Sequence, residues 1–172
     1  MRLIIAASLA ALLGLTGCGY HTLGAATHLP PNLHTLSVPV FANHTDDYGT
    51  ETALTSAVIR EFNARTPYHV VPMSDSNADA VLHGTILNES VAPLTYNAQT
   101  QQSSSFLITM VVAVTVKDRD GRVLYANNNY VFRQQYQSTT VLPTFLQEDP
   151  AAVARLSRDF ARQLVADVVE GF

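Results

Sequence analysis

Few residues in this sequence have the type and spacing needed for catalysis or for metal binding. The six histidines lie scattered from His21 to His83 and show no paired ligand spacing. Asp118-x-Asp120-Gly121 resembles the start of a calcium loop, but the later oxygen ligands and the distal glutamate are missing, so a hairpin turn explains it better. The sequence has no Gly-x-Ser-x-Gly elbow and no phosphate-binding loop. We therefore expect a protein that is not an enzyme and that uses no metal or other cofactor.

The single cysteine has a distinctive setting. An apolar run from Leu3 to Leu15 follows Arg2; a membrane-spanning helix needs about 20 such residues, so the run is typical of a secretory signal peptide. Leu15-Thr16-Gly17-Cys18 then resembles the lipobox of bacterial lipoproteins. An ordinary signal peptide with a chance cysteine is the alternative, but it would leave an unpaired thiol in an oxidising compartment. The pattern thus favours lipidation at Cys18.

The lipobox predicts cleavage before Cys18 and covalent attachment of a diacylglycerol and an N-acyl lipid. One acyl chain anchors a protein only marginally, whereas three chains would hold it permanently. Gly19 follows instead of Asp, which in such lipoproteins resembles an address for the periplasmic face of the outer membrane. We expect a signal peptide over residues 1–17, a lipidated tether over 18–32 and one α/β domain over 33–172.

The charge of the chain limits its partners. Ten Lys and Arg face fourteen Asp and Glu, a net charge of −4, so we expect no nucleic-acid binding. Lys117, Arg119 and Arg122 crowd the tip of a predicted hairpin, where they could contact lipid phosphates or an acidic partner. Arg155, Arg158 and Arg162 recur at helical spacing, with Asp159 able to pair with Arg155 or Arg162. A charged turn and a solvated helix face are the simpler explanation of the two groups, and the hairpin tip is the better candidate for a contact.

The first half of the sequence predicts a strand, a helix and a second strand. Leu36–Phe41 alternates like a strand, and Pro39 would place it at a sheet edge or make it start late. Apolar residues at helical spacing predict a helix over about 50–65, which Pro67 stops. Tyr68–Val71 follows as a strand, so the unit can form a parallel crossover.

The second half predicts an antiparallel hairpin. Ala80–Val91 is strand-like and is expected to end at Pro93. Residues 106–117 form the strongest strand, with one wholly apolar face and one mixed face. The turn at 118–121 leads to a return strand over 123–136.

Two features complete the prediction. Asn127–Asn129 interrupts the return strand and indicates a bulge or an exposed segment. The last helix is expected to begin with Asp149 as its cap and Pro150 in its first turn, and to end at Gly171.

These elements together predict the fold class α/β (α+β): a two-layer sandwich with two helices packed on one face of a mixed, mostly antiparallel sheet of four to five strands. The strand over 106–117 is longer than the mean of 5–6 residues, so part of the sheet could be covered by another protein.

Five segments together resemble a known family by their order and spacing. They are Cys18–His21, Val38–Thr45, Glu51–Phe62, Ala78–Ile86 and Asp120–Tyr125. The chain is similar to the lipopolysaccharide-assembly lipoproteins of the LptE family. The resemblance implies a protein that sits inside the β-barrel of its partner LptD, assists its assembly, plugs it and binds lipopolysaccharide. A periplasmic binding module, such as an activator of cell-wall synthesis or a lipid-transporter subunit, is the alternative.

The resemblance also implies a role for basic residues near the sheet in lipopolysaccharide contact. Some family members carry a cation where this chain has Tyr130, and the loop Thr95–Thr100 is uncharged here. The candidates for contact with lipopolysaccharide or with the partner are therefore Lys117, Arg119, Arg122 and Arg133.

Overall fold

The structure is a computed structural model that describes residues 29–30, 32–96, 103–137 and 142–170. The predicted signal peptide, the lipidation site Cys18, most of the tether and the helix exit at Gly171 lie outside the described residues. No helix in the described part of the chain is long and apolar enough to cross a membrane.

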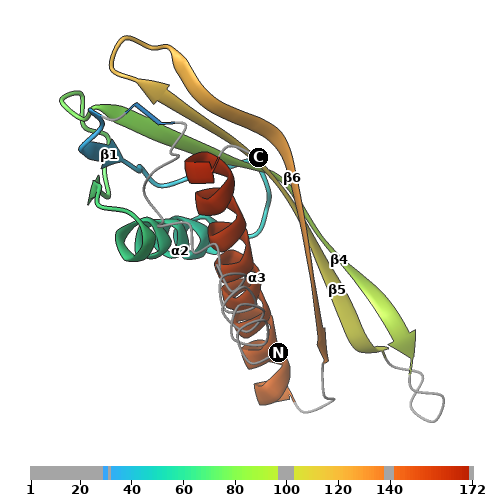
Figure 1. Cartoon of the computed structure of the whole chain (residues 1–172). Helices are drawn as coiled ribbons and strands as arrows, with labels where there is room; N and C mark the ends of the chain where they lie inside the picture. The colour runs from blue at the N-terminus through green and yellow to red at the C-terminus, as the bar shows by residue number, and fades with distance from the viewer. Residues whose placement is uncertain (1–28, 31, 97–102, 138–141, 171–172) are drawn as a thin grey trace, which may run out of the picture.

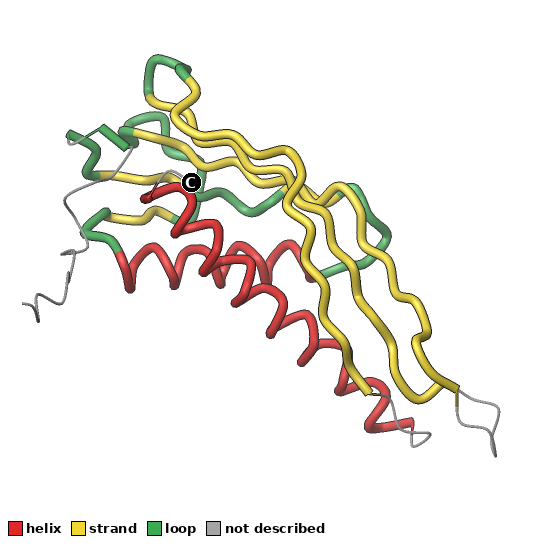
Figure 2. The backbone as a smooth tube through the Cα atoms, turned by 45° about the vertical axis from the view of Figure 1, so that its right-hand side comes forward, coloured by secondary structure: helices red, strands yellow, loops and turns green. Residues whose placement is uncertain are grey.

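The described residues form one sheet with two helices packed on one of its faces (Figures 1 and 2). The six strands are β1 (Thr35–Ser37), β2 (Ala42–Asn43), β3 (His69–Val71), β4 (Ala80–Tyr96), β5 (Ser103–Asp118) and β6 (Val123–Gln137). The helices are α2 (Thr50–Arg65) and α3 (Leu142–Glu170). The strand order is β3-β1-β4-β5-β6, and β2 pairs with β4 off this path. The predicted two-layer fold is confirmed, with one strand more than expected.

The strand pairing is mixed, as predicted. β1 runs parallel to both β3 and β4, so the chain from β1 through α2 to β3 forms the expected parallel crossover. β4, β5 and β6 form an antiparallel meander. Its register shifts between Val112 and Val114, opposite Asn127–Asn129, which confirms the predicted bulge.

Three predictions that were based on the position of a proline are wrong. The strand predicted over Leu36–Phe41 ends at Ser37 and lies between β3 and β4, so its placement at an edge is wrong. The chain leaves the sheet before Pro39, where the missing N–H costs no ladder bond. β4 also continues past Pro93 to Tyr96. Its register shifts directly after Pro93, and no described strand pairs with the other edge of β4 there, so the proline is tolerated.

The third proline lies within α3. This helix begins at Leu142, so Pro150 is inside it and Asp149 is not its cap. A proline in a helix removes one backbone hydrogen bond and favours a bend, but it does not prevent helix on both sides. The prediction over residues 50–65, by contrast, coincides with α2. Gly49 precedes α2 with a positive φ of 95°, a conformation that glycine adopts readily.

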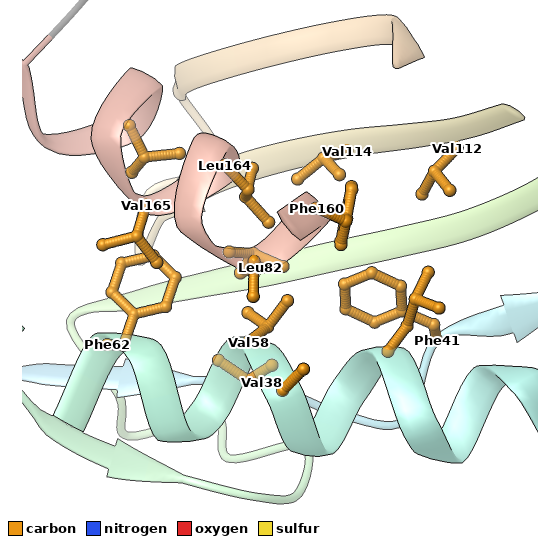
Figure 3. Close-up of a cluster of buried hydrophobic side chains, with 14 of the residues drawn as sticks. Val38, Phe41, Val58, Phe62, Leu82, Val112, Val114, Phe160, Leu164 and Val165 are labelled. Atoms are coloured by element: carbon orange, nitrogen blue, oxygen red, sulfur yellow. The ribbon is translucent and has the colours of Figure 1, made fainter. Parts of the chain in front are cut away.

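The core lies between the helices and the sheet, and Phe160 of α3 is at its centre (Figure 3). The Phe160 side chain is fully buried. Its ring makes edge contacts with Phe41, Tyr130 and Phe132, at centroid distances of 6.1, 5.7 and 5.3 Å. Each such pair contributes roughly 0.5–1.5 kcal/mol beyond its buried area. One aromatic cluster thereby joins α3 to β6 and to the segment before β2.

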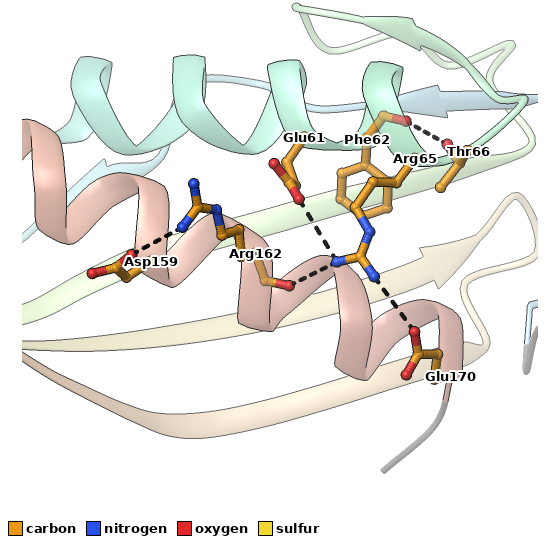
Figure 4. A network of polar contacts seen from close by, with 7 residues as sticks. All are labelled: Glu61, Phe62, Arg65, Thr66, Asp159, Arg162 and Glu170. Atoms are coloured by element: carbon orange, nitrogen blue, oxygen red, sulfur yellow. Dashed lines mark hydrogen bonds and ion pairs between the residues drawn. The ribbon is translucent and has the colours of Figure 1, made fainter. Parts of the chain in front are cut away.

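A second junction joins the ends of the two helices (Figure 4). Arg65 Nη1 lies 3.6 Å from Glu61 Oε1, and Arg65 Nη2 lies 3.4 Å from Glu170 Oε1. Arg65 also donates a hydrogen bond to the carbonyl oxygen of Arg162. The expected pairing of Asp159 occurs with Arg162, at 3.6 Å. Partly exposed pairs of this kind contribute about 0–1 kcal/mol each, so apolar packing dominates the helix–helix contact.

Candidate interaction surfaces

The turn between β5 and β6 is built by Asp118 and Gly121. The Gly121 N–H donates to the Asp118 carbonyl at 3.0 Å, and the Arg122 N–H donates to Asp118 Oδ1 at 2.8 Å. Gly121 has a positive φ of 82°. The hairpin reading of this motif is therefore confirmed. In the described part of the chain, no group of three or more acidic, histidine or cysteine side chains could hold a metal ion.

The two arginines at this turn are engaged by carboxylates. Arg119 Nη2 lies 3.2 Å from Asp79 Oδ1 and donates to the Asn77 carbonyl. Arg122 Nε lies 3.3 Å from Asp118 Oδ2. These ion pairs tie the hairpin tip together and to the segment before β4. They also offset the positive charge that suggested an anion contact at the tip.

Asp79 is the central residue of this junction. Its Oδ2 accepts hydrogen bonds from the backbone N–H groups of His34 and Thr35, at 3.0 and 2.9 Å. These two bonds, together with the positive charge of Arg119, hold the pKa of Asp79 below its ordinary value of 3.8. Asp79 thus connects the start of β1 to the hairpin tip.

A cavity of about 380 Å³ lies at the same junction. It is lined by Pro30, Asn32, Leu33, Asp79, Asp118, Arg119, Asp120, Arg122 and Leu124. Sites for small molecules are mostly apolar with a few convergent polar groups, whereas three carboxylates and two paired guanidinium groups dominate this wall. The cavity therefore suits neither an apolar substrate nor a phosphate.

Arg133 lies far from the other candidate cations. It pairs with Thr109 of β5, eight positions along the strand from Lys117. At about 3.4 Å per residue, the two backbone positions are roughly 27 Å apart. The structure thus brings Lys117, Arg119 and Arg122 to one end of the sheet and leaves Arg133 near its other half.

Tyr130, where some family members carry a cation, is a core residue here. Its side chain is 4% exposed, and its hydroxyl donates to Asp167 Oδ2 of α3 at 2.7 Å. The hydroxyl of Tyr125 also forms a hydrogen bond with the Tyr130 hydroxyl. Burial, and then the hydrogen bonds with Tyr125 and Asp167, raise the pKa of Tyr130. This position joins β6 to α3 and is not accessible to a ligand.

The sheet face opposite the helices forms a separate surface, which we call the open face. Alternate residues of β5 from Ile108 to Val116 are fully buried under the helices, and those between them are partly exposed. Residues paired across the ladder share a face, which defines the open face as Val81, His83, Thr85, Asn88, Ser90, Ala92, Leu107, Thr109, Val111, Ala113, Thr115, Lys117, Val123, Ala126, Val131, Arg133 and Gln135. Both helices lie on the other side of the sheet (Figure 2).

The sequence predicted only part of this surface. The alternation over residues 106–117 indicated that one face of β5 would carry both polar and apolar side chains. The contribution of β4 and β6, and hence the position of Arg133 on the same face as Lys117, depends on the register of the ladder. Register shifts in both the β4–β5 and the β5–β6 ladders interrupt the pairing, so alternation counted from the sequence does not give the faces.

Solved structures with similar folds include several bacterial lipoproteins. Lipoprotein B from Nitrosomonas europaea aligns with a TM-score of 0.55 and 12% identity, over 86% of this chain and 89% of that one. PelC from Paraburkholderia phytofirmans, a dodecamer, aligns with a TM-score of 0.51 and 11% identity, over 87% and 96%. Rare lipoprotein B from Shewanella oneidensis aligns with a TM-score of 0.50 and 15% identity, over 78% and 92%. At these identities the likeness shows the fold alone.

Sequence comparison identifies the family. The comparison with curated protein sequences gives no significant match. The profile of the family LptE, described as lipopolysaccharide-assembly, matches residues 33–168, which is most of the chain and contains every described strand. The chain therefore belongs to the LptE family of lipopolysaccharide-assembly proteins.

Proposed function

We propose that this protein is an outer-membrane lipoprotein that assists the assembly of an LptD-type β-barrel and plugs it for transport of lipopolysaccharide to the cell surface. The family match over residues 33–168 carries this proposal. Lipid on Cys18 would anchor the chain to the periplasmic face of the outer membrane, within one short tether of the barrel opening.

The shape of the domain fits a plug. β4, β5 and β6 have 17, 16 and 15 residues, and at about 3.3 Å per residue the longest extends roughly 55 Å. α3 has 29 residues, runs along the same meander and contacts β6 (Figure 1). An elongated domain with one continuous core can occupy the lumen of a barrel as a folded unit. Such a role requires no catalytic group.

The ion pairs decide which of the four candidate cations are most available for a contact. Arg119 and Arg122 are engaged by Asp79 and Asp118. Among the described residues, no ion pair involves Lys117 or Arg133. A phosphate would have to displace a carboxylate from either arginine of the turn, whereas Lys117 and Arg133 are available without that cost. We therefore place the contact with lipopolysaccharide or partner first at Lys117 and Arg133.

Depletion of the protein tests the proposal. Cells that lose it should lose correctly folded LptD-type barrel and surface lipopolysaccharide, and a plasmid copy of the wild-type gene should restore both. Normal barrel levels and normal surface lipopolysaccharide after depletion would refute the function.

A further inference from the structure

The chain enters the domain beside the hairpin tip. Leu29 and Leu33 are buried in the core, and the Leu33 N–H donates to the Pro30 carbonyl at 3.0 Å. Pro30, Asn32 and Leu33 line the same cavity as the residues of the turn between β5 and β6. The cavity therefore lies where the chain that leads from Cys18 joins the domain.

The length of that chain decides which end of an anchored domain can face the membrane. Eleven residues run from Cys18 to His28, and even fully extended they span at most about 40 Å. β5 has 16 residues and extends roughly 50 Å from the tip to its other end at Ser103. An anchored domain therefore cannot stand on the far end of the meander. The cavity is held near the headgroups of the bilayer, where a tethered site meets its ligand at a high effective concentration.

The charges that line the cavity are of both signs. Arg119 pairs with Asp79, and its side chain is still 59% exposed. Arg122 pairs with Asp118, and its side chain is 77% exposed. Asp120 is exposed and takes part in no ion pair within the described part of the chain. The cavity thus carries one negative charge in excess, on a carboxylate that can accept a cation.

This set of charges selects a zwitterionic ligand. A phosphate that takes either arginine from its carboxylate leaves that carboxylate without a cation. A ligand that also carries an ammonium group supplies the missing cation, and Asp120 offers a further acceptor for its N–H donors. A primary ammonium donates such hydrogen bonds, whereas the trimethylated ammonium of choline has no N–H to donate.

We propose that this cavity binds the zwitterionic headgroup of a phospholipid with a primary ammonium, and that the hairpin-tip end of the domain lies on the membrane surface. The ammonium contacts Asp120, and the phosphate contacts the exposed guanidinium groups of Arg119 and Arg122. This inference rests on the lipid anchor at Cys18, which is part of the proposed function. It goes beyond that function because it gives the domain a ligand and a membrane-facing end before any barrel is bound.

Fluorescence quenching in vesicles tests which end faces the bilayer. Lipid occupies the thiol of Cys18, the single cysteine, so an introduced cysteine can be labelled alone. Val123→Cys places a fluorophore beside the tip, and Gln137→Cys places one at the far end of β6; both positions are exposed. The full lipidated chain is reconstituted in vesicles of phosphatidylethanolamine and phosphatidylcholine with a quencher on some headgroups.

Quenching should be several-fold stronger at the tip than at the far end. Equal quenching at the two positions, or stronger quenching at the far end, would overturn the inference and leave the proposed function intact. A chain that does not bind the vesicles at all would refute the lipid anchor as well.

A change of headgroup and of one carboxylate tests the ligand. With the fluorophore at the tip, quenching should rise by about two- to fivefold, the effect of one exposed charge contact, when phosphatidylethanolamine replaces half of the phosphatidylcholine. Asp120→Asn should abolish that rise. The matched control Asp46→Asn, at an exposed carboxylate outside the cavity, should preserve it. Equal quenching with both lipids, a rise that survives Asp120→Asn, or a larger rise with anionic phosphatidylglycerol would overturn the proposal.

Discussion

Replacement of Gly84 by alanine should destabilise the fold through one defined contact. Gly84 lies on the buried side of β4, and a Cβ added there would come closer than 3.0 Å to three carbon atoms of the Phe41 ring. The ring cannot easily retreat. It is 2% exposed and packs edge-on against Phe160, and the Phe41 N–H donates to Thr55 Oγ1 at 3.0 Å.

The magnitude follows from two opposing terms. Overpacking of a filled core costs about 1–3 kcal/mol, and replacing glycine by alanine within a strand returns roughly 0.5–1 kcal/mol of conformational entropy. Gly84→Ala should therefore lower the free energy of unfolding by about 1–2 kcal/mol. In a Phe41→Ala background, which itself costs roughly 3–5 kcal/mol, the clash is gone. The second substitution should then be neutral or slightly stabilising.

Urea denaturation of the wild type, both single variants and the double variant measures this coupling, which we expect to be about 1–3 kcal/mol. His83→Ala is the matched control, because this neighbouring side chain is exposed on the open face, and its effect should stay within about 0.5 kcal/mol. Equal costs of Gly84→Ala with and without the Phe41 ring would refute the close contact.

Three further substitutions test the polar junctions. Tyr130→Phe should cost about 1–3 kcal/mol in urea denaturation, because Asp167 loses its buried donor; an unchanged midpoint would argue against that bond. Asp79→Ala should lower the free energy of unfolding near neutral pH and reduce the loss of stability that the wild type shows below about pH 4. The reason is that folding lowers the pKa of Asp79, so its stabilisation is present above pH 3.8 and disappears as the pH falls through the lowered pKa. A variant whose stability falls with acid as steeply as that of the wild type would contradict this. Arg65→Ala should cost no more than about 1 kcal/mol, and less in high salt; a larger, salt-independent loss would mean that packing of its side chain matters more.

Much of the fold follows from local patterns in the sequence. The apolar spacing over residues 50–65 coincides with α2, and the turn residues Asp118–Gly121 form the predicted hairpin. Both signals are local, because helical spacing and turn chemistry depend on neighbours in the sequence. The errors at Pro39, Pro93 and Pro150 share a different cause. The cost of a proline depends on whether a partner strand or turn needs its N–H, and only the tertiary structure decides that.

The candidate site was less predictable than the fold. The sequence placed Lys117, Arg119 and Arg122 together correctly, but it could not show that Asp79, 40 residues before Arg119, pairs with that arginine. Long-range ion pairs leave no signature in spacing or composition. The position of Arg133 on the open face likewise depends on the two register shifts between β5 and β6.

Co-purification from outer membranes in mild detergent tests the central claim most directly. The full lipidated chain should recover a large outer-membrane β-barrel of the LptD type in a stable complex, and a Cys18→Ala variant should lose membrane attachment and recover much less. Recovery of a cell-wall synthase or of transporter subunits instead, without any barrel, would contradict the proposed plug.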